Sequence, residues 1–182
     1  MRVVDLVFGL GWVVFWLYWL VSAAGAKPGK TQWTRFAGFR VAMILIILLL
    51  VRLKVFRGHD VVRDPVLWGV GLGLFAIGLG LAVWARVYLG RNWGMPMSTK
   101  AEPELVTSGP YKIIRNPIYT GLILAMIGTA IGISIYWLIA AVLGGGYFVY
   151  SAVVEERNMA RLFPAAYPAY KQSTKMLIPF VF

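Results

Sequence analysis

Long uncharged stretches dominate the chain and alternate with shorter segments that carry most of the basic residues. A bilayer core about 30 Å thick needs roughly 20 apolar residues of helix to cross it. Runs of this kind occupy residues 6–24, 41–51 (extending back to about 36), 66–85, 117–131 and 134–154. We therefore predict an all-α integral membrane protein of about five transmembrane helices, the last two forming a hairpin with a very short tip.

The first apolar run also has features of a secretory signal peptide. Arg2 precedes it, and Ala24-Gly25-Ala26 fits the small-residue cleavage pattern. Its apolar stretch is longer than the usual core of a signal peptide, so we expect it to be a membrane span.

The composition excludes several classes of protein. Hydrophobic residues make up 60% and charged residues 14% of the chain, with a mean hydropathy of +0.74. This balance excludes a soluble globular enzyme and a disordered chain. Cysteine is absent and His59 is the one histidine, so we expect no disulfide and no metal site. We expect residues 1–182 to form a single membrane domain.

Lys and Arg residues predict the orientation. Thirteen of them fall in the first loop, the third loop and the tail, against five on the other side of the five spans. The positive-inside rule then places the N-terminus outside and the C-terminus in the cytoplasm of an inner or cytoplasmic membrane. The net charge of +11 fits loops that face anionic lipid, so we expect the bilayer, not nucleic acid, as partner. His59 is expected in an outer loop.

Glycines concentrate inside the predicted spans. Gly69 and Gly73 form one G-x-x-x-G pair, and Gly128 and Gly132 form another. Because small residues let helices approach closely in lipid, we predict that both pairs are packing seams.

Polar residues concentrate in 86–116 and 155–175, which the topology places on the same cytoplasmic face. Asn116-Pro117 predicts a helix start with Asn116 as the N-cap. The free N–H groups there, with Arg115 beside them, could bind an anion; alternatively, Arg115 reaches lipid headgroups.

Glu155 and Glu156 directly follow an apolar span, where carboxylates are costly without partners, so we expect a functional role. A surface ion-pair cluster with Arg157 and Arg161 is the alternative. Helical spacing predicts an amphipathic tail that lies against the membrane or caps a pocket. Its shared face would hold Glu156, Met159, Phe163, Ala166, Tyr167 and Tyr170.

The two polar stretches together resemble a known family. The chain matches, from Leu105 to Pro179, a Leu-Val-x-x-Gly-Pro-Tyr-x-x-x-Arg-His-Pro-x-Tyr-x-Gly block, a hairpin, a Glu-Glu pair and Phe-Gly-x-x-Tyr-x-x-Tyr. This pattern is similar to that of the isoprenylcysteine carboxyl methyltransferases and their phospholipid methyltransferase relatives. Residues 90–93 resemble the family's Gly-x-Asn-Trp lead-in. Asn116 stands where better-known members have His, and Pro164 where Gly usually follows Phe163.

The resemblance implies transfer of a methyl group from S-adenosyl-L-methionine to a lipid-borne acceptor. The cofactor-binding and catalytic part would be residues 86–182, made of a loop (86–116), the hairpin (117–154) and the tail (155–182). Arg115 would orient the acceptor and Glu156 would face the site, as catalytic residues. The implied cofactor-binding residues are Leu105, Val106, Gly109, Tyr111, Asn116, Tyr119, Glu156, Phe163 and Tyr167.

Several acceptors stay open. An isoprenylcysteine-like carboxylate needs no general base, and charge neutralisation during transfer favours a dry site at the membrane edge. A phospholipid amine or a small thiol is the alternative; for a protonated amine, Glu155, Glu156 or a tyrosine would be the base. A sterol-type reductase, a non-catalytic membrane scaffold and a small transporter are the remaining readings, and the oligomeric state is open.

Overall fold

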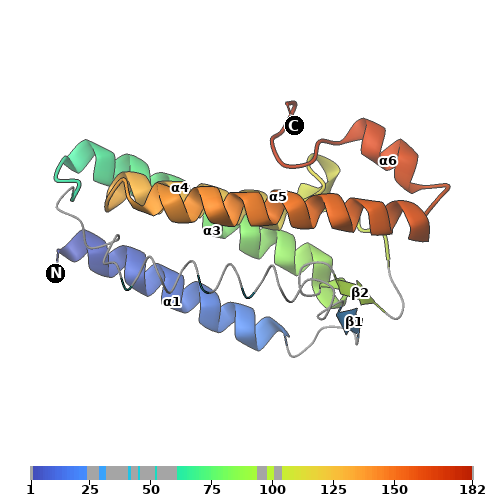
Figure 1. Cartoon of the computed structure of the whole chain (residues 1–182), viewed down its shortest axis with the longest axis horizontal. Coiled ribbons are helices and arrows are strands. Elements are labelled where there is room, and N and C mark those ends of the chain that lie inside the picture. The colour runs from blue at the N-terminus through green and yellow to red at the C-terminus, as the bar shows by residue number, and fades with distance from the viewer. Residues whose placement is uncertain are drawn as a thin grey trace.

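Helices make up most of the computed structural model (Figure 1), which describes residues 2–23, 29–31, 41, 45, 52, 61–93, 98–100 and 104–181. The α-helices are α1 (Val3–Ala23), α3 (Pro65–Leu89), α4 (Pro117–Gly132), α5 (Trp137–Leu162) and α6 (Tyr167–Ser173). Two 3₁₀ helices are η2 (Gly90–Asn92) and η3 (Gly109–Lys112). Short strands β1 (Gly29–Thr31) and β2 (Ser98–Lys100) pair antiparallel, with Gly29 opposite Lys100. The prediction of an all-α class is confirmed, with this one small ribbon added.

Three of the described helical segments are long and apolar enough to cross a membrane: Val3–Ala23, Pro65–Asn92 and Trp137–Leu162. The apolar helix α4 is shorter, with 16 residues. The expected span at 36–51 lies outside the described residues except for Val41 and Leu45, which are helical. His59 and the Ala24-Gly25-Ala26 segment also lie outside them.

Local sequence explains the helix boundaries. Asp64 caps α3 by accepting a hydrogen bond from Val66 N at 2.8 Å, and Pro65 follows at the first helical position. α5 begins after a tip formed by Ile133–Tyr136 and continues to Leu162, eight residues beyond the predicted end at 154. It ends before Pro164, which disfavours helix in the preceding residue. The prediction of one amphipathic helix through 156–170 is therefore wrong, because a turn separates α5 from α6.

The contact between α3 and α4 is built from glycines. A Cβ on Gly78 would lie 2.5 Å from both Ala125 N and Gly121 O, and one on Gly128 would lie 2.6 Å from Gly71 O. Gly132 also faces Gly71, so the Gly128/Gly132 pair is confirmed as part of the seam.

The Gly69/Gly73 pair is not part of this seam, and its predicted packing role is not confirmed within the described residues. No described atom lies within 4 Å of a Cβ built on Gly69 or Gly73. On α3 the seam instead uses Gly71 and Gly78, which are seven residues apart and share a face.

α1 packs beside the α3–α4 seam through aromatic side chains. The rings of Phe8 and Phe75 lie 4.9 Å apart, and those of Trp12 and Phe75 lie 5.5 Å apart. Trp12 also donates a hydrogen bond to Thr129 Oγ1 of α4 at 3.2 Å. These contacts tie α1 to the α3–α4 pair.

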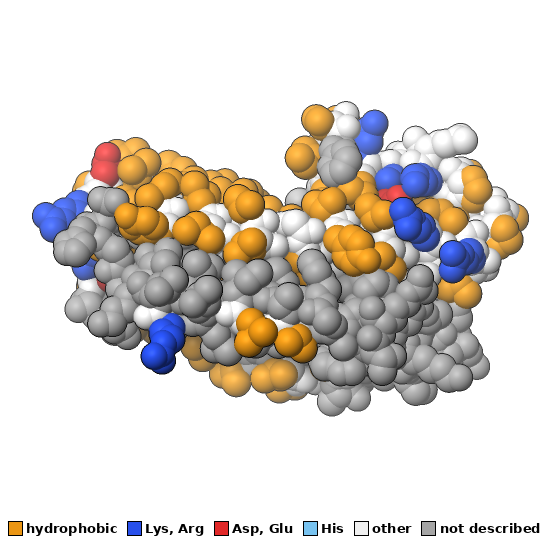
Figure 2. Space-filling view, in the orientation of Figure 1, with side chains coloured by type: hydrophobic (Ala, Val, Ile, Leu, Met, Phe, Trp, Pro, Cys, Tyr) orange, Lys and Arg blue, Asp and Glu red, His pale blue; other side chains and the backbone are white. Residues whose placement is uncertain are grey.

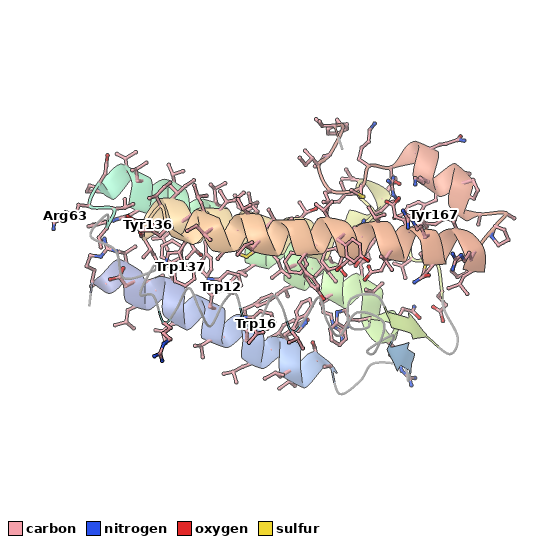
Figure 3. All side chains as sticks on the ribbon, viewed as in Figure 1. Trp12, Trp16, Arg63, Tyr136, Trp137 and Tyr167 are labelled. Atoms are coloured by element: carbon pink, nitrogen blue, oxygen red, sulfur yellow. The ribbon has the colours of Figure 1, made fainter. Side chains whose placement is uncertain are left out.

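The bundle has two distinct ends. Arg2 donates hydrogen bonds to the carbonyls of Val62 and Ile133, which places the starts of α1 and α3 beside the hairpin tip. Figure 3 shows Arg63, Tyr136 and Trp137 at this end and Tyr167 at the other. In Figure 2, hydrophobic side chains cover the middle, and Lys and Arg side chains gather over the end that carries α6. The two polar stretches predicted to share one face do lie together at that end.

Candidate functional site

A cavity of about 540 Å³ lies at the end of the bundle that carries α6. Small-molecule sites commonly measure roughly 300–1,000 Å³. Its walls come from α1, the end of α3 with η2, the residues before α4, both hairpin helices and α6. Most of the predicted site residues line it: Leu105, Val106, Tyr111, Arg115, Asn116, Tyr119, Glu156 and Tyr167.

Two predicted site residues, Gly109 and Phe163, do not line the cavity. Gly109 has a φ of +59°, and a Cβ there would lie 2.5 Å from the Tyr88 ring. Phe163 ends α5, and its N–H donates to Met159 O at 2.9 Å. Both residues shape the backbone next to the cavity.

The loop before α4 is joined to the tail through backbone hydrogen bonds. Arg115 N donates to Lys175 O at 2.8 Å, and Asn116 N donates to Met176 O at 3.1 Å. The Tyr170 hydroxyl donates to Tyr111 O at 2.7 Å. Segments about 60 residues apart in sequence therefore form one wall of the cavity.

The same wall carries a cluster of three charged residues, Arg115, Glu156 and Lys171, of which the first two line the cavity. Arg115 Nε lies 2.6 Å from Glu156 Oε1, and both side chains are 9% exposed. Lys171 Nζ lies 2.9 Å from Glu156 Oε2, but the Lys171 side chain is 54% exposed. Arg115 also donates to the carbonyls of Lys171 and Thr174. The Arg115–Glu156 pair thus holds the tail against the loop, and breaking a buried pair of this kind is strongly destabilising.

The neighbouring carboxylate, Glu155, has a different partner in the cavity. The Tyr119 hydroxyl donates to Glu155 Oε1 at 2.6 Å, and both residues line the cavity. The Tyr119 ring stacks on Phe148 with centroids 4.9 Å apart. Sequence reasoning favoured Glu156 as the carboxylate facing the site; the structure places both glutamates in its lining.

Asn116 stands at the N-cap position of α4 but makes no side-chain cap. Its side-chain amide donates to Met176 O at 3.2 Å instead. The predicted helix start, with Asn116 at the N-cap position, is therefore confirmed, but the capping hydrogen bond is absent because the Asn116 side chain bonds to the tail. Thr120 completes the contact by donating to Leu177 O at 2.7 Å.

The tyrosines outside the spans are held protonated. Burial raises the pKa of Tyr111 and of Tyr167 far above the usual value, and the charges of Glu155 and Glu156, respectively, add to this. Burial also raises the pKa of Tyr170 to about 12, against the opposing effect of the Arg115 guanidinium. These three side chains therefore stay protonated near neutral pH and can donate hydrogen bonds.

Sequence reasoning missed an aromatic wall of the cavity. Trp16 and Trp19 from α1, and Trp93 just after η2, lie opposite Tyr147 and Phe148 of α5. Figure 3 shows Trp12 and Trp16 on the side of α1 that faces α5. The spacing of tryptophans along α1 was the available signal, since residues three or four apart share a helix face.

Comparison with known proteins identifies similar sequences. The family model for phospholipid methyltransferase matches residues 67–166, which include nearly all of α3 and the whole of α4 and α5. Within the described residues, no group of three or more His, Asp or Glu side chains could hold a metal ion.

Three curated relatives are methyltransferases. A methanethiol S-methyltransferase of Pseudomonas sp. is 26% identical over 87% of this chain and 67% of its own length. Methanethiol S-methyltransferase 1 of Bradyrhizobium diazoefficiens is 29% identical over 87% of this chain and 61% of its own length. Protein-S-isoprenylcysteine O-methyltransferase B of Arabidopsis thaliana is 29% identical over 61% of this chain and 58% of its own length. The chain thus spans about two thirds or less of these relatives.

Proposed function

Because the chain belongs to the phospholipid methyltransferase family of membrane enzymes, we propose that it transfers a methyl group from S-adenosyl-L-methionine to an apolar acceptor. The observation that carries this proposal is the cavity, which joins a charged side made by the loop and tail to an aromatic side made by α1 and η2. Residues 86–182 would supply the cofactor contacts and the reacting groups. Trp16 and Trp19 of α1, which lie outside residues 86–182, would add an aromatic wall.

The residues of the cavity fit the cofactor. Carboxylates suit its ammonium group, and aromatic rings suit both the adenine ring and a sulfonium cation. Glu156 and Tyr167 from the tail side, Asn116 at the N-cap position of α4 and the ring of Tyr119 would hold it. Leu105, Val106 and Tyr111 complete the wall. When bound, the cofactor would supply an electrophilic methyl group on sulfur.

The position of α1 favours an acceptor that dissolves in the bilayer. Trp16 lies on a membrane-spanning helix, lines the cavity and remains 49% exposed. A molecule that partitions into the bilayer would therefore meet this side of the cavity first. The charged side, by contrast, is closed by the tail.

The charges in the cavity favour a thiol acceptor. Arg115, the residue expected to orient a carboxylate, is already paired with Glu156. Glu155 would repel a second carboxylate, whereas a thiol can lose its proton to Glu155 as its sulfur bonds to the methyl carbon. The bound cofactor would supply the methyl group, keep the electron pair of its methyl–sulfur bond and leave as the neutral thioether. The Tyr119 hydroxyl would keep Glu155 in place. Both methanethiol S-methyltransferase relatives fit this choice.

An isoprenylcysteine-like carboxylate is the second candidate. Arg115 lines the cavity, and the Arabidopsis relative is an isoprenylcysteine methyltransferase. A phospholipid amine corresponds to the description of the family.

A direct assay separates these acceptors. Purified protein in lipid vesicles would receive methyl-labelled cofactor with methanethiol, hexanethiol, N-acetyl-S-farnesylcysteine or phosphatidylethanolamine. We expect label in the two thioethers. Label only in a base-labile ester or only in the lipid would support the other acceptors and contradict the thiol. If no acceptor receives label and calorimetry detects no binding of S-adenosylhomocysteine, the proposal that the protein is a methyltransferase is wrong.

A matched variant tests the role of Glu155. Glu155→Gln should bind S-adenosylhomocysteine like the wild type but methylate thiols at least about 100-fold more slowly, the size expected for loss of a general base. Transfer at the wild-type rate would show that another group takes the proton.

We also propose that the cavity faces the cytoplasm. Exposed Arg157, Arg161, Lys171 and Lys175 surround its end of the molecule, as the positive-inside rule requires. Because the chain has no cysteine, Ile135→Cys at the hairpin tip and Ser173→Cys on α6 give clean labelling sites. In intact cells an impermeant reagent should label the first variant only. Labelling of the second only would reverse the orientation.

A further inference from the structure

Arg86 is a buried charge in a membrane-spanning helix, and neither the cavity lining nor the ion pairs of the tail include it. It lies in the last turn of α3 and is 5% exposed. An ionisable residue at such a position is costly unless its donors find partners, and such residues are commonly functional.

The guanidinium joins the ends of two helices. Nη1 donates to Gly90 O at 2.6 Å, and Nη2 donates to Ser22 O in the last turn of α1. Carbonyls at helix C-termini lack partners within the helix and carry the negative end of its dipole, so they suit a cation. Arg86 thereby fixes the end of α1 beside the end of α3.

The same guanidinium lies over an aromatic ring of the cavity wall. Its central carbon is 4.8 Å from the centre of the Trp93 ring. Trp93 meets the edge of Trp19 at 5.6 Å, and Trp19 stacks with Phe15 at 5.1 Å. Trp93 and Trp19 both line the cavity, so Arg86 touches the back of the wall whose front faces the ligand space.

We propose that Arg86 is a positioning residue that sets the aromatic side of the cavity and so determines which acceptors fit. This inference rests on the proposed function. The polar groups of the cofactor need the charged side formed by α5, α6 and the loop, which leaves the Trp93–Trp19 side for the apolar part of the acceptor. A lysine at position 86 cannot replace Arg86 fully. A single ammonium group cannot bind the carbonyls of Ser22 and Gly90 and also lie over the Trp93 ring.

The test compares Arg86→Lys with Arg91→Lys, a neighbouring exposed arginine of η2. In Arg86→Lys the KM for hexanethiol should rise about tenfold, as expected for loss of a partly desolvated cation–π contact, while that for methanethiol rises less. The dissociation constant of S-adenosylhomocysteine should stay within about twofold of the wild type. Arg91→Lys should change none of these values.

A purely structural role would give a different result. If Arg86→Lys lowers stability but leaves the ratio of the two KM values unchanged, or weakens S-adenosylhomocysteine binding as much as hexanethiol use, the proposal is wrong. Should Arg86→Lys fail to fold, Trp93→Leu keeps both carbonyl contacts of Arg86 and must reproduce the shift in the KM ratio. Failure of the proposed function gives a separate result. The wild type itself would then neither bind S-adenosylhomocysteine nor methylate either thiol. That result would overturn both the proposed function and the role of Arg86.

Discussion

Two regions of this bundle differ in the size of the side chains between their helices, and the difference determines where the molecule is closed and where it is hollow. Between α3 and α4, Gly71, Gly78, Gly121 and Gly128 bring the backbones into contact. Between α1 and α5, by contrast, tryptophan, tyrosine and phenylalanine side chains surround a cavity of about 540 Å³. Close packing of small residues gives membrane helices their stability, so the glycine seam can serve as the rigid base on which the wider site stands.

The seam can be broken by a single side chain. In Gly78→Leu the new atoms would meet backbone atoms of α4 that cannot move aside, so we expect a loss of about 3 kcal/mol or more and little folded protein. Thermal unfolding in detergent measures this. Gly80→Leu is the matched control, since no described atom lies within 4 Å of its Cβ position. Equal losses in both variants would show that the seam is not the stabilising contact.

On the cavity side, the largest effect is expected at Glu156. Glu156→Gln leaves the buried Arg115 guanidinium without its carboxylate and should cost about 3 kcal/mol, with weaker S-adenosylhomocysteine binding as the tail loosens. Lys171→Met removes the exposed partner of the same carboxylate and should cost at most about 1 kcal/mol. Denaturant unfolding and calorimetry distinguish the two variants. A larger loss of stability in Lys171→Met than in Glu156→Gln would show that Lys171, not Arg115, is the main partner of Glu156.

A smaller effect is expected at Tyr119. Tyr119→Phe keeps the ring stacked on Phe148 but removes the hydrogen bond to Glu155, so thiol methylation should slow about tenfold while S-adenosylhomocysteine binding changes little. Steady-state kinetics with hexanethiol measure this. Loss of binding with unchanged kcat would show that the Tyr119 hydroxyl, and not only its ring, contacts the cofactor.

The smallest effect concerns pH. Tyr170 is held protonated up to a pKa of about 12, above the value of about 10 expected for an unfolded chain. The buried, protonated Tyr170 therefore contributes fully to the stability of the fold below about pH 10, and this contribution is lost as the pH rises from about 10 through about 12. Absorbance of phenolate against pH should show a late-ionising component that Tyr170→Phe reduces. Ionisation of every tyrosine near pH 10 in the folded protein would contradict the burial of this wall.

Local patterns in the sequence predicted much of this arrangement. Pro117 marks the start of α4, and the hydrophobic runs locate α1, α3 and the hairpin to within a few residues, except at the end of α5. The ordered motifs identified eight residues that line the cavity. Such features depend on near neighbours in the chain, which a single sequence displays directly.

The features that were missed depend on distant partners. Helical spacing groups Gly69 with Gly73 as readily as Gly71 with Gly78, and only the position of α4 decides between the two faces. Asn116 is a good cap by its residue type, but Met176 O attracts its amide across 60 residues. The spacing of the tryptophans in α1 indicates a shared helix face, but only the packing of α1 beside the cavity shows that Trp16 and Trp19 belong to the site.

The pairing of the loop with the tail also has a consequence for how the protein is made. The glycine seam uses residues up to Gly132, so it can form as soon as α4 has left the ribosome. The cavity, however, needs the carbonyls of Thr174, Lys175 and Met176, which are synthesised more than 40 residues later. During translation the membrane bundle can therefore assemble first as an inactive intermediate, and ligand binding becomes possible only when the tail closes onto the loop.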